Sequence, residues 1–354
     1  MKSEIDAVIG KILSKGDLIM RRHLSDFENN MASFLGVKYA IGVGNCTDAL
    51  YFSLRAAGIG RGDEVITVSH TFVATLEAIV HCGAKPVLVD IGEDFNMDVQ
   101  LLEKAITLRT KAILPVHLNG RLCDMGNMMA IARKYNLVII EDAAQALGAT
   151  FDGKKAGSFG LTGCFSFYPA KLLGALGDGG LVCTNSKSLA RKIRLLRDHG
   201  RESKNKLAFY GFNSRLDNLQ AAVLDVKLKH VPQWIQRRRE LANIYTDILK
   251  DVREVKLPLF SGNNDRFFDV YQNYVIRAQK RDKLSKYLKK HGIEILISNP
   301  IPVHHQKALN LCHFRLPNTE RFAKEVISLP LFPELSDKQV AYTARTVRNF
   351  YKNS

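Results

Sequence analysis

The sequence predicts an α/β protein, with a large domain built on a mostly parallel central sheet flanked by helices and a smaller C-terminal α/β domain. The first observation is that apolar strand patterns alternate with helical patterns up to about Trp234, as in parallel sheets joined by right-handed crossovers. The second is length, because 354 residues exceed the size at which one core stops growing. We therefore expect an N-terminal segment over 1–22, a large domain over 23–235 and a small domain over 236–354.

The composition is that of an ordinary globular protein, with 46% hydrophobic and 24% charged residues. No apolar run reaches transmembrane length, and the start, MKSEIDAVIGKILSKGD, is an interrupted amphipathic segment rather than a signal peptide. The six cysteines are scattered and form no C-x-x-C pair. We therefore expect buried free thiols, no metal site, no membrane association and a cytoplasmic location.

The net charge of +16 comes from 51 Lys and Arg against 35 Asp and Glu. Basic clusters over 191–206, 237–239 and 280–290 contain apolar residues at helical spacing or intervening acids. This pattern favours the solvated faces of ordinary helices, with attraction of an anionic substrate as a secondary effect. No segment resembles a nucleic-acid-binding module, so we expect no nucleic-acid partner.

The chain begins its alternation with an amphipathic helix over 23–35 and a strand over 39–43, and a second helix then ends at Gly58. The loop before the second helix is typical of a phosphate cradle, in which backbone amides and the Thr47 hydroxyl stabilise a dianion. A simpler interpretation is that Thr47 or Asp48 is only the N-cap of this helix.

A dinucleotide site is an alternative for the same loop, because Gly42 and Gly44 follow a strand. The third glycine of that motif is missing, however. The acids Asp63 and Glu64 precede the next strand instead of ending it. The spacing therefore argues against dinucleotide binding.

The middle of the chain continues the alternation. His117 ends an apolar strand, and a structural role is favoured for it. The methionine-rich helix that follows is typical of the hydrophobic core. The expected strands cover 64–68, 85–91, 111–117 and 137–142, and the expected helices cover 73–82, 99–106 and 123–135.

The stretch CFSFYPAKLLGALGDGG, residues 164–180, is the most informative part of the sequence. An apolar strand breaks at Pro169, and Lys171 then precedes four glycines. An ammonium group is costly to bury, whereas glycines let another molecule approach the backbone closely. The pattern indicates a nucleophilic amine that forms a Schiff base with a carbonyl cofactor.

A carboxylate is expected beside this amine. The strand LVIIED ends in Asp142, and ligands of open α/β sheets bind at the carboxyl ends of the strands. An acid placed against the pyridinium nitrogen of pyridoxal phosphate keeps the ring protonated, so that it can act as an electron sink.

Four ordered blocks, EDAAQALGA, GSFG, CFSFYPAKLLGALGDGG and GFNSRLDNLQAAVLDVKL, resemble the DegT/DnrJ/EryC1/StrS family. Members of this family are pyridoxal-phosphate-dependent sugar aminotransferases of fold type I. The resemblance extends from about Asp26 to Glu334. It implies that Lys171 forms the Schiff base, that Asp142 pairs with the pyridinium nitrogen and that Gln145 lies near the phenolic oxygen of the ring. Relatives with histidine in place of this lysine are dehydratases, so Lys171 implies transamination.

The resemblance also implies the remaining cofactor contacts. Phe72 matches the residue that stacks on the ring, with His70 as an alternative and plain core as another. Ser166 matches the phosphate-binding serine, and Cys46, where the family usually has glycine, joins Thr47 in the phosphate loop. Asn213 matches a residue that reaches the phosphate of the neighbouring subunit, which implies a homodimer with shared active sites.

Substrate contacts are implied for two residues. Arg215 can hold an anionic substrate group, although an ion pair with Asp217 is an alternative. His304, in PIPVHHQ, matches a histidine near the substrate mouth. The family commonly has a tyrosine where this chain has Asn299. The small domain should also contain a helix over 281–291 and strands over 270–278 and 293–297.

The resemblance implies transfer of an amino group, with L-glutamate as the expected donor, to a nucleotide-linked keto-sugar. The spelling of the lysine segment favours a 3-keto sugar linked to dTDP or UDP. The product would be an amino sugar for a surface polysaccharide, such as the O-antigen of lipopolysaccharide, or for a glycoside. The alternatives are a 4-keto sugar, a keto-cyclitol, or a non-catalytic cofactor-binding regulator.

Overall fold

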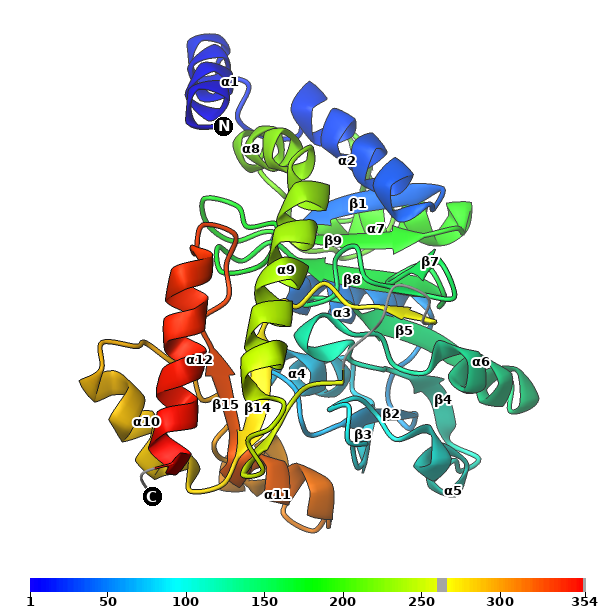
Figure 1. Cartoon of the computed structure of the whole chain (residues 1–354). Helices are drawn as coiled ribbons and strands as arrows, with labels where there is room; N and C mark the ends of the chain where they lie inside the picture. Colours follow the sequence, from blue (N-terminus) through cyan, green and yellow to red (C-terminus); the bar gives the residue numbers. More distant parts are fainter. Residues whose placement is uncertain (260–265, 353–354) are drawn as a thin grey trace.

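The large sheet of the molecule has seven strands in the order β1-β9-β8-β5-β4-β2-β3 (Figure 1). The computed structural model describes residues 1–259 and 266–352. Strand β9 is antiparallel to both of its neighbours, and the other four pairings are parallel. The mostly parallel sheet predicted from the sequence is therefore confirmed. The strands are β1 Tyr39–Val43, β2 Glu64–Val68, β3 Lys85–Val89, β4 Thr110–Ile113, β5 Val138–Asp142, β8 Thr162–Ser166 and β9 Gly180–Thr184.

Both faces of this sheet are buried under helices, as expected for parallel strands. Successive residues of a strand enter opposite cores: Ile66 packs in one hydrophobic cluster and Val65 in the other. Helices α2, α6 and α8 contribute to the first cluster, and α3, α4 and α7 contribute to the second. The helices are α2 Arg22–Leu35, α3 Cys46–Ala56, α4 Ala74–His81, α5 Leu102–Ala105, α6 Met125–Lys134, α7 Lys187–Arg197 and α8 Asn218–Leu228, with short 3-10 turns at Val99–Leu101 and Leu118–Gly120.

A buried ion pair fixes the edge of the sheet. The Arg197 side chain of α7 donates from Nη1 to Glu28 of α2 and to the Gly42 carbonyl of β1. Glu28 in turn accepts the Gly42 N–H at 2.9 Å. Breaking one partner of such a pair leaves a buried charge uncompensated, so α2 and α7 are held firmly against β1.

The C-terminal part forms a second sheet of three antiparallel strands in the order β12-β14-β15, with its own core. Helix α9 runs from beside α8 to this second sheet, where it packs against α12 (Figure 1). Because α9 spans residue 235, the domain boundary predicted there stays a prediction. The elements are α9 Val231–Leu249, β12 Val255–Lys256, β14 Tyr274–Ala278, α10 Arg281–Lys290, α11 Pro317–Glu325, β15 Val326–Leu329 and α12 Asp337–Lys352, with 3-10 turns η3 Val303–His305 and η4 Lys307–Leu309.

Four segments differ from the sequence-based expectation. The strands expected over 111–117 and 270–278 are shorter and cover Thr110–Ile113 and Tyr274–Ala278, and two further segments differ in kind. The basic stretch 191–206 is helical only to Arg197, because His199 and Gly200 adopt positive φ angles of 58° and 71° that stop a helix. The segment 293–297 is not a strand, since its only bridge joins Leu296 to Ser328. The smaller elements are α1 Lys2–Lys15 and the short strands β6 Thr150–Phe151, β7 Lys154–Lys155, β10 Arg201–Ser203, β11 Lys206–Leu207 and β13 Phe267–Phe268.

The length and apolar character of the helices decide whether any of them could span a membrane. Among residues 1–259 and 266–352, no helix combines the length and the apolar character needed to cross a bilayer.

Candidate active site

The predicted site residues gather where strands of the large sheet end. Strand β5 ends at Asp142 and the adjacent β8 ends at Ser166. The loop 167–179 carries Lys171 from β8 to β9, whose first residue, Gly180, pairs with Ser166 and with Val43 at the end of β1. These ends form one edge, the place where open α/β sheets bind their ligands.

Asp142 is held in a fixed orientation. The hydroxyl of Thr75 donates to Oδ2 at 2.9 Å, and the Ala144 N–H donates to Oδ1 at 3.2 Å. Thr71 Oγ1 lies 2.7 Å from Thr75 Oγ1 and extends the network. Burial raises the pKa of Asp142 above 3.8, whereas the Thr75 and Ala144 hydrogen bonds and the charge of Lys171 lower it. The two donors thus oppose the effect of burial, which is the larger effect.

Lys171 lies in a tight, half-buried turn. Its backbone N–H donates to the Tyr168 carbonyl at 2.8 Å. A Cβ on Gly174 would lie 2.4 Å from the Pro169 oxygen, so the turn needs glycine there. Burial lowers the pKa of the Lys171 amine below 10.5, whereas Cys46 and Asp142 raise it. The amine is thus more easily deprotonated than a surface lysine, as a nucleophile requires.

Gln272, which precedes β14, clamps the backbone on both sides of Lys171. Its Oε1 accepts the Leu172 N–H at 2.8 Å, and its Nε2 donates to the Ala170 carbonyl at 3.0 Å. Gln272 is buried, with 7% of its surface exposed. The sequence analysis missed this role, because in VYQNYVIRA the glutamine is only one polar residue in an expected strand.

The predicted phosphate loop packs directly on Gly180. A Cβ there would lie 2.4 Å from the Asn45 carbonyl and 2.8 Å from the Cys46 nitrogen, so the close approach depends on glycine. Ser166 pairs with Gly180, which brings Ser166 and the first turn of α3 together. The N-cap of α3 is Asn45, which accepts the Asp48 N–H at 2.8 Å, so the alternative of Thr47 or Asp48 as N-cap is wrong. Thr47 lies in the first turn of α3, where backbone N–H groups have no partner within the helix and can bind an anion.

Cys46 connects this loop electrostatically to the amine and the acid. Burial raises the pKa of its thiol well above 9.0, Asp142 and Cys164 raise it further, and Lys171 lowers it. The thiol therefore stays neutral. The helix N-terminus, Lys171 and Asp142 share one small region, as a cofactor with a carbonyl, a ring nitrogen and a phosphate requires.

The geometry agrees with comparisons to known proteins. The sequence model of the DegT/DnrJ/EryC1/StrS aminotransferase family matches residues 1–348. The chain belongs to this family. It is 42% identical to a protein of Geobacillus stearothermophilus named pleiotropic regulatory protein, over 100% of this chain and 96% of that protein.

Two further relatives are named as enzymes. The UDP-N-acetyl-3-dehydro-alpha-D-glucosamine 3-aminotransferase of Acidithiobacillus ferrooxidans is 41% identical, over 98% of this chain and 94% of that protein. The dTDP-3-amino-3,4,6-trideoxy-alpha-D-glucose transaminase of Streptomyces venezuelae is 40% identical, over 99% of this chain and 93% of that protein.

Solved structures match over the whole fold. The structure of S. venezuelae DesV in complex with a ketimine intermediate has a TM-score of 0.95 and 40% identity, and the match covers 99% of this chain and 94% of that one. The structure of NtdA from Bacillus subtilis with bound cofactor PMP has a TM-score of 0.90 and 31% identity. This match covers 98% of this chain and 82% of that one. The chain is a pyridoxal-phosphate-dependent aminotransferase of fold type I, so the predicted fold, cofactor and enzyme class are confirmed.

The remaining cofactor candidates differ in exposure. The Phe72 side chain is 69% exposed and available for stacking, whereas His70 is buried with its ring 6.0 Å from that of Phe95. Gln145 accepts the Asn119 N–H at 2.9 Å through its Oε1, which fixes that side chain beside the site. Stacking by Phe72 and the ring contact of Gln145 stay predictions.

The two substrate candidates are both engaged within the chain. Arg215 Nη1 donates to Asp198 Oδ1 at 3.1 Å, so its ion-pair partner is Asp198 and not its sequence neighbour Asp217. His304 is fully buried, and its Nδ1 lies 2.7 Å from Ser69 Oγ. Each side chain would have to change partners to reach a substrate, so both contacts stay predictions.

Glu141 was passed over in the sequence analysis, although it precedes Asp142 directly. Its fully buried carboxylate accepts the N–H groups of Gly157, Phe159 and Gly160 at 2.8, 2.7 and 2.6 Å. His117 accepts the Cys123 N–H on Nδ1, so its Nε2 donates to Glu141 at 3.0 Å. Four donors thus compensate one buried charge, and His117 has the structural role that was favoured.

We expect Gln272→Ala to lower kcat by about 10- to 100-fold, because misplacing a reacting group by roughly 1 Å can cost that much. The protein should stay folded, since two hydrogen bonds contribute about 0.5–1.5 kcal/mol each. Steady-state kinetics with the cofactor at saturation would measure the effect. Gln279→Ala, at an exposed position of the same segment, is the matched control. Equal kcat values for the two variants would show that the clamp does not position Lys171.

Proposed function

We propose that the protein transfers the amino group of L-glutamate to the ketone of a nucleotide-linked sugar, with the ketone at C3 and dTDP or UDP as the nucleotide. The observation that carries the proposal is the half-buried amine of Lys171. It lies near the carboxylate of Asp142, which Thr75 fixes, at the edge of the sheet where the parallel strands end. Two relatives with about 40% identity are named for 3-amino transfer on UDP- and dTDP-linked sugars, which supports the C3 position.

Each residue has a defined task in this proposal. Pyridoxal phosphate, when bound, supplies an electron sink. The neutral Nζ of Lys171 accepts the proton that leaves the donor α-carbon and later returns it. Asp142 Oδ2 and Oδ1 stay fixed by Thr75 and Ala144 and hold negative charge against the ring nitrogen. Ser166, Thr47 and the first turn of α3 bind the phosphate.

The donor and the sugar are tested in sequence with the holoenzyme. L-glutamate should bleach the absorbance of the Lys171-bound cofactor and release one 2-oxoglutarate for each active site. A dTDP- or UDP-linked 3-keto sugar should then restore the absorbance and yield the amino sugar. Restoration only by a 4-keto sugar would overturn the C3 assignment. Restoration by a free keto-cyclitol, without competition from nucleoside diphosphate, would overturn the nucleotide-sugar assignment.

The product is proposed to be an amino sugar for a surface polysaccharide, such as a lipopolysaccharide O-antigen, or for a glycoside, made in the cytoplasm. A non-catalytic regulator would need the Lys171 amine to retain the cofactor, but it would have no need for the carboxylate of Asp142, fixed by Thr75 and Ala144, that keeps the ring electron-poor. The absence of any glutamate-dependent bleaching would favour that regulator instead.

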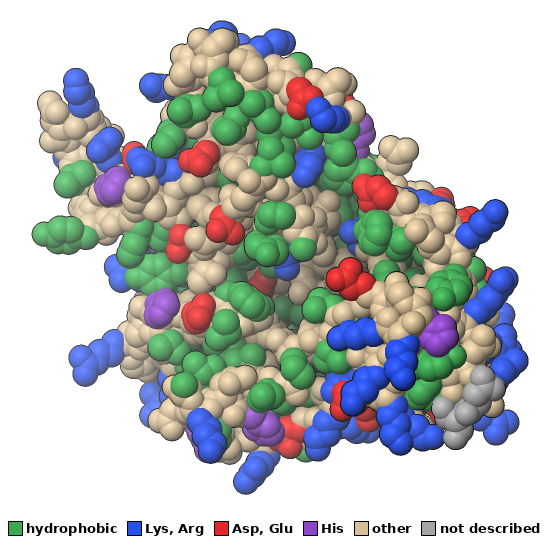
Figure 2. All heavy atoms as spheres, turned by 90° about the vertical axis from the view of Figure 1, so that its left-hand side faces the viewer, with side chains coloured by type: hydrophobic (Ala, Val, Ile, Leu, Met, Phe, Trp, Pro, Cys, Tyr) green, Lys and Arg blue, Asp and Glu red, His purple; other side chains and the backbone are tan. Residues whose placement is uncertain are grey.

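We propose further that two copies of this chain share their active sites. Several side chains near the site are exposed although they are hydrophobic, and Tyr210, three residues before Asn213, is 98% exposed. Figure 2 shows hydrophobic side chains over the middle of one side of the molecule, while Lys and Arg gather at its lower right and around its outline. Exposed patches of this kind are typical of subunit interfaces. The exposed hydrophobic residues are Phe72, Tyr168 and Leu176, which lie next to predicted site residues in the sequence, and Tyr210 and Phe212, which precede Asn213.

Asn213→Ala should raise the dissociation constant of pyridoxal phosphate by about 10- to 100-fold, through the loss of one hydrogen bond to a charged group worth about 1.5–3 kcal/mol. Asn213 is exposed in the isolated chain, so the partner's phosphate is its expected acceptor. Equilibrium titration of the apoprotein would measure the change, with Asn205→Ala, at another exposed asparagine, as the control.

Mixing two variants tests the sharing directly. A Lys171→Ala chain and an Asn213→Ala chain together rebuild one intact site in each mixed dimer. After subunit exchange, about a quarter of all sites should be intact at a cofactor concentration too low for Asn213→Ala alone. No recovery on mixing would mean that each chain completes its own site.

A further inference from the structure

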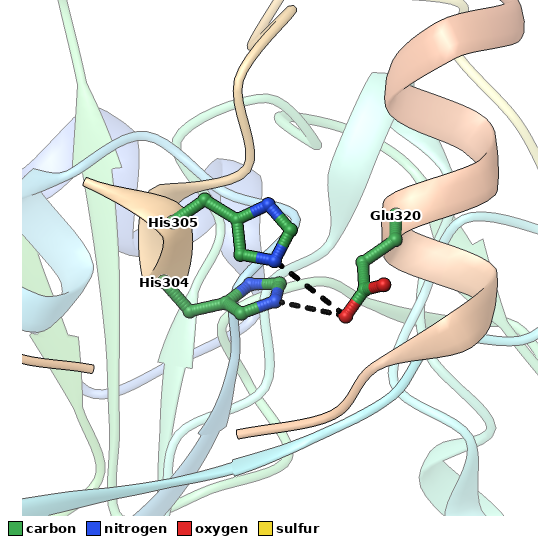
Figure 3. Close-up of side chains that lie close together, drawn as sticks. All are labelled: His304, His305 and Glu320. Carbon is green, nitrogen blue, oxygen red and sulfur yellow. Dashed lines mark hydrogen bonds and ion pairs between the residues drawn. The ribbon is translucent and has the colours of Figure 1, made fainter. Parts of the chain in front are cut away.

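Three side chains converge outside the site of Lys171 and Asp142. His304 and His305 come from η3, and Glu320 comes from α11 (Figure 3). The Nε2 atoms of the two histidines lie 3.4 and 3.6 Å from the same oxygen, Glu320 Oε1. One ligand-type atom from each residue lies within 4.8 Å of the others.

These separations suit a shared metal ion better than hydrogen bonds. Charge-assisted N–H···O bonds are about 2.7–2.9 Å long, clearly shorter than the observed distances. A tetrahedral zinc ion with bonds of about 2.0–2.1 Å places neighbouring ligand atoms about 3.3–3.4 Å apart. The observed 3.4 and 3.6 Å are close to that edge length.

The surrounding residues orient these ligands. Ser69 Oγ accepts the His304 backbone N–H at 3.1 Å and lies 2.7 Å from Nδ1 of the same ring. With Nδ1–H donating to Ser69, the lone pair of Nε2 is free for a metal. The Leu316 N–H donates to Glu320 Oε1 at 3.1 Å and fixes the carboxylate. Metal-binding histidines typically donate their second ring nitrogen in this way.

The cluster is closed on one side and open on the other. His304 is fully buried, whereas the side chains of His305 and Glu320 are 38% and 30% exposed. An ion can therefore approach from solvent and keep a water molecule as its fourth ligand. Two histidines and one glutamate with an open position are a ligand set that zinc uses in proteins.

We propose that His304, His305 and Glu320 form a zinc site with water as the fourth ligand. The ion would join η3 to α11 and, through Ser69, to the end of β2. The same segment contains Asn299, whose Nδ2 donates to the Thr71 carbonyl at 2.8 Å, next to the network that holds Asp142. A bound ion would therefore stabilise this wall of the active site. The sequence analysis expected no metal because it considered cysteine spacing alone.

Calorimetric titration of chelator-treated holoenzyme with Zn²⁺ tests the proposal, which does not depend on the amino donor or the sugar. We use a Cys312→Ser background, because Cys312 is the exposed one of the six free cysteines. One ion per chain is expected to bind. His305→Ala should weaken binding by at least about 10- to 100-fold, the loss typical even for residues that only orient a ligand. His313→Ala, at an exposed histidine eight positions further on, is the matched control.

One more variant and a second measurement keep the test independent of folding defects. Glu320→Gln preserves the shape and can still accept the Leu316 N–H, yet it should weaken zinc binding as His305→Ala does. Zn²⁺ should raise the Tm of the parent and of His313→Ala, but not that of Glu320→Gln. Equal zinc affinity in all variants, or no binding to the parent, would overturn the proposal and leave the three side chains as an ion-pair cluster.

Discussion

Lys171→Ala is expected to reduce turnover by at least about 10⁴-fold, the upper end of what a positioned acid–base group contributes. The same amine is also the expected attachment point of the cofactor, so the absorbance of the bound cofactor should change from that of a Schiff base to that of the free aldehyde. Steady-state assays and the visible spectrum measure the two effects on one sample. The fold should persist, because the hydrogen bond from the Lys171 backbone N–H to the Tyr168 carbonyl is retained in the alanine variant.

Lys155→Ala is a matched control for this experiment. Burial also lowers the pKa of the Lys155 amine, but that side chain lies in β7 and donates to the Phe34 carbonyl, away from Asp142. It should keep full turnover and the normal spectrum, whatever its effect on stability. Turnover retained in Lys171→Ala, or lost equally in both variants, would remove Lys171 from its assigned role.

Local patterns in the sequence were sufficient to predict the sheet and the edge of the sheet at which the site residues lie. The alternation of strands and helices predicts strands that end together, so Asp142 and Ser166 had to lie at one edge. Lys171 was conspicuous because a lysine before several glycines is a poor choice for a buried turn. These inferences depend on residues near one another in the chain, or on a topology with few alternatives.

The contacts that the sequence analysis missed join distant segments of the chain. Gln272 lies about a hundred positions after the turn that it clamps, and Ser69 and His304 are 235 positions apart. No periodicity or spacing rule connects such pairs. The end of α7 differs from the prediction for another reason: the basic stretch 191–206 was expected to be helical, but it has no apolar residue after Leu196, and positive φ angles at His199 and Gly200 end the helix. The backbone conformation of a single residue, such as a positive φ angle, leaves little trace in the amino-acid sequence.

Asp142→Asn is expected to lower kcat by about 10²–10³-fold, as for loss of one preorganised charge or donor in an active site. The exchange should preserve the structure. The amide oxygen can accept the Ala144 N–H, and the amide nitrogen can donate to Thr75 Oγ1, whose hydroxyl can turn toward Thr71 Oγ1 at 2.7 Å. What disappears is the negative charge that the ring nitrogen needs. Unchanged kcat would show that Asp142 does not serve the cofactor ring.

Substitutions of Thr75 test whether this residue influences the pKa of Asp142 in addition to the position of its carboxylate. The Thr75 hydrogen bond lowers the pKa of Asp142, whereas burial raises it. In Thr75→Val the lowering contribution is lost, so the pKa of Asp142 rises further. Because the carboxylate form is the active one, the acid limb of the kcat profile should move to higher pH, and Thr75→Ser should restore its position. A loss of kcat that is equal at every pH would mean that Thr75 supports the packing around Asp142 and does not influence its protonation.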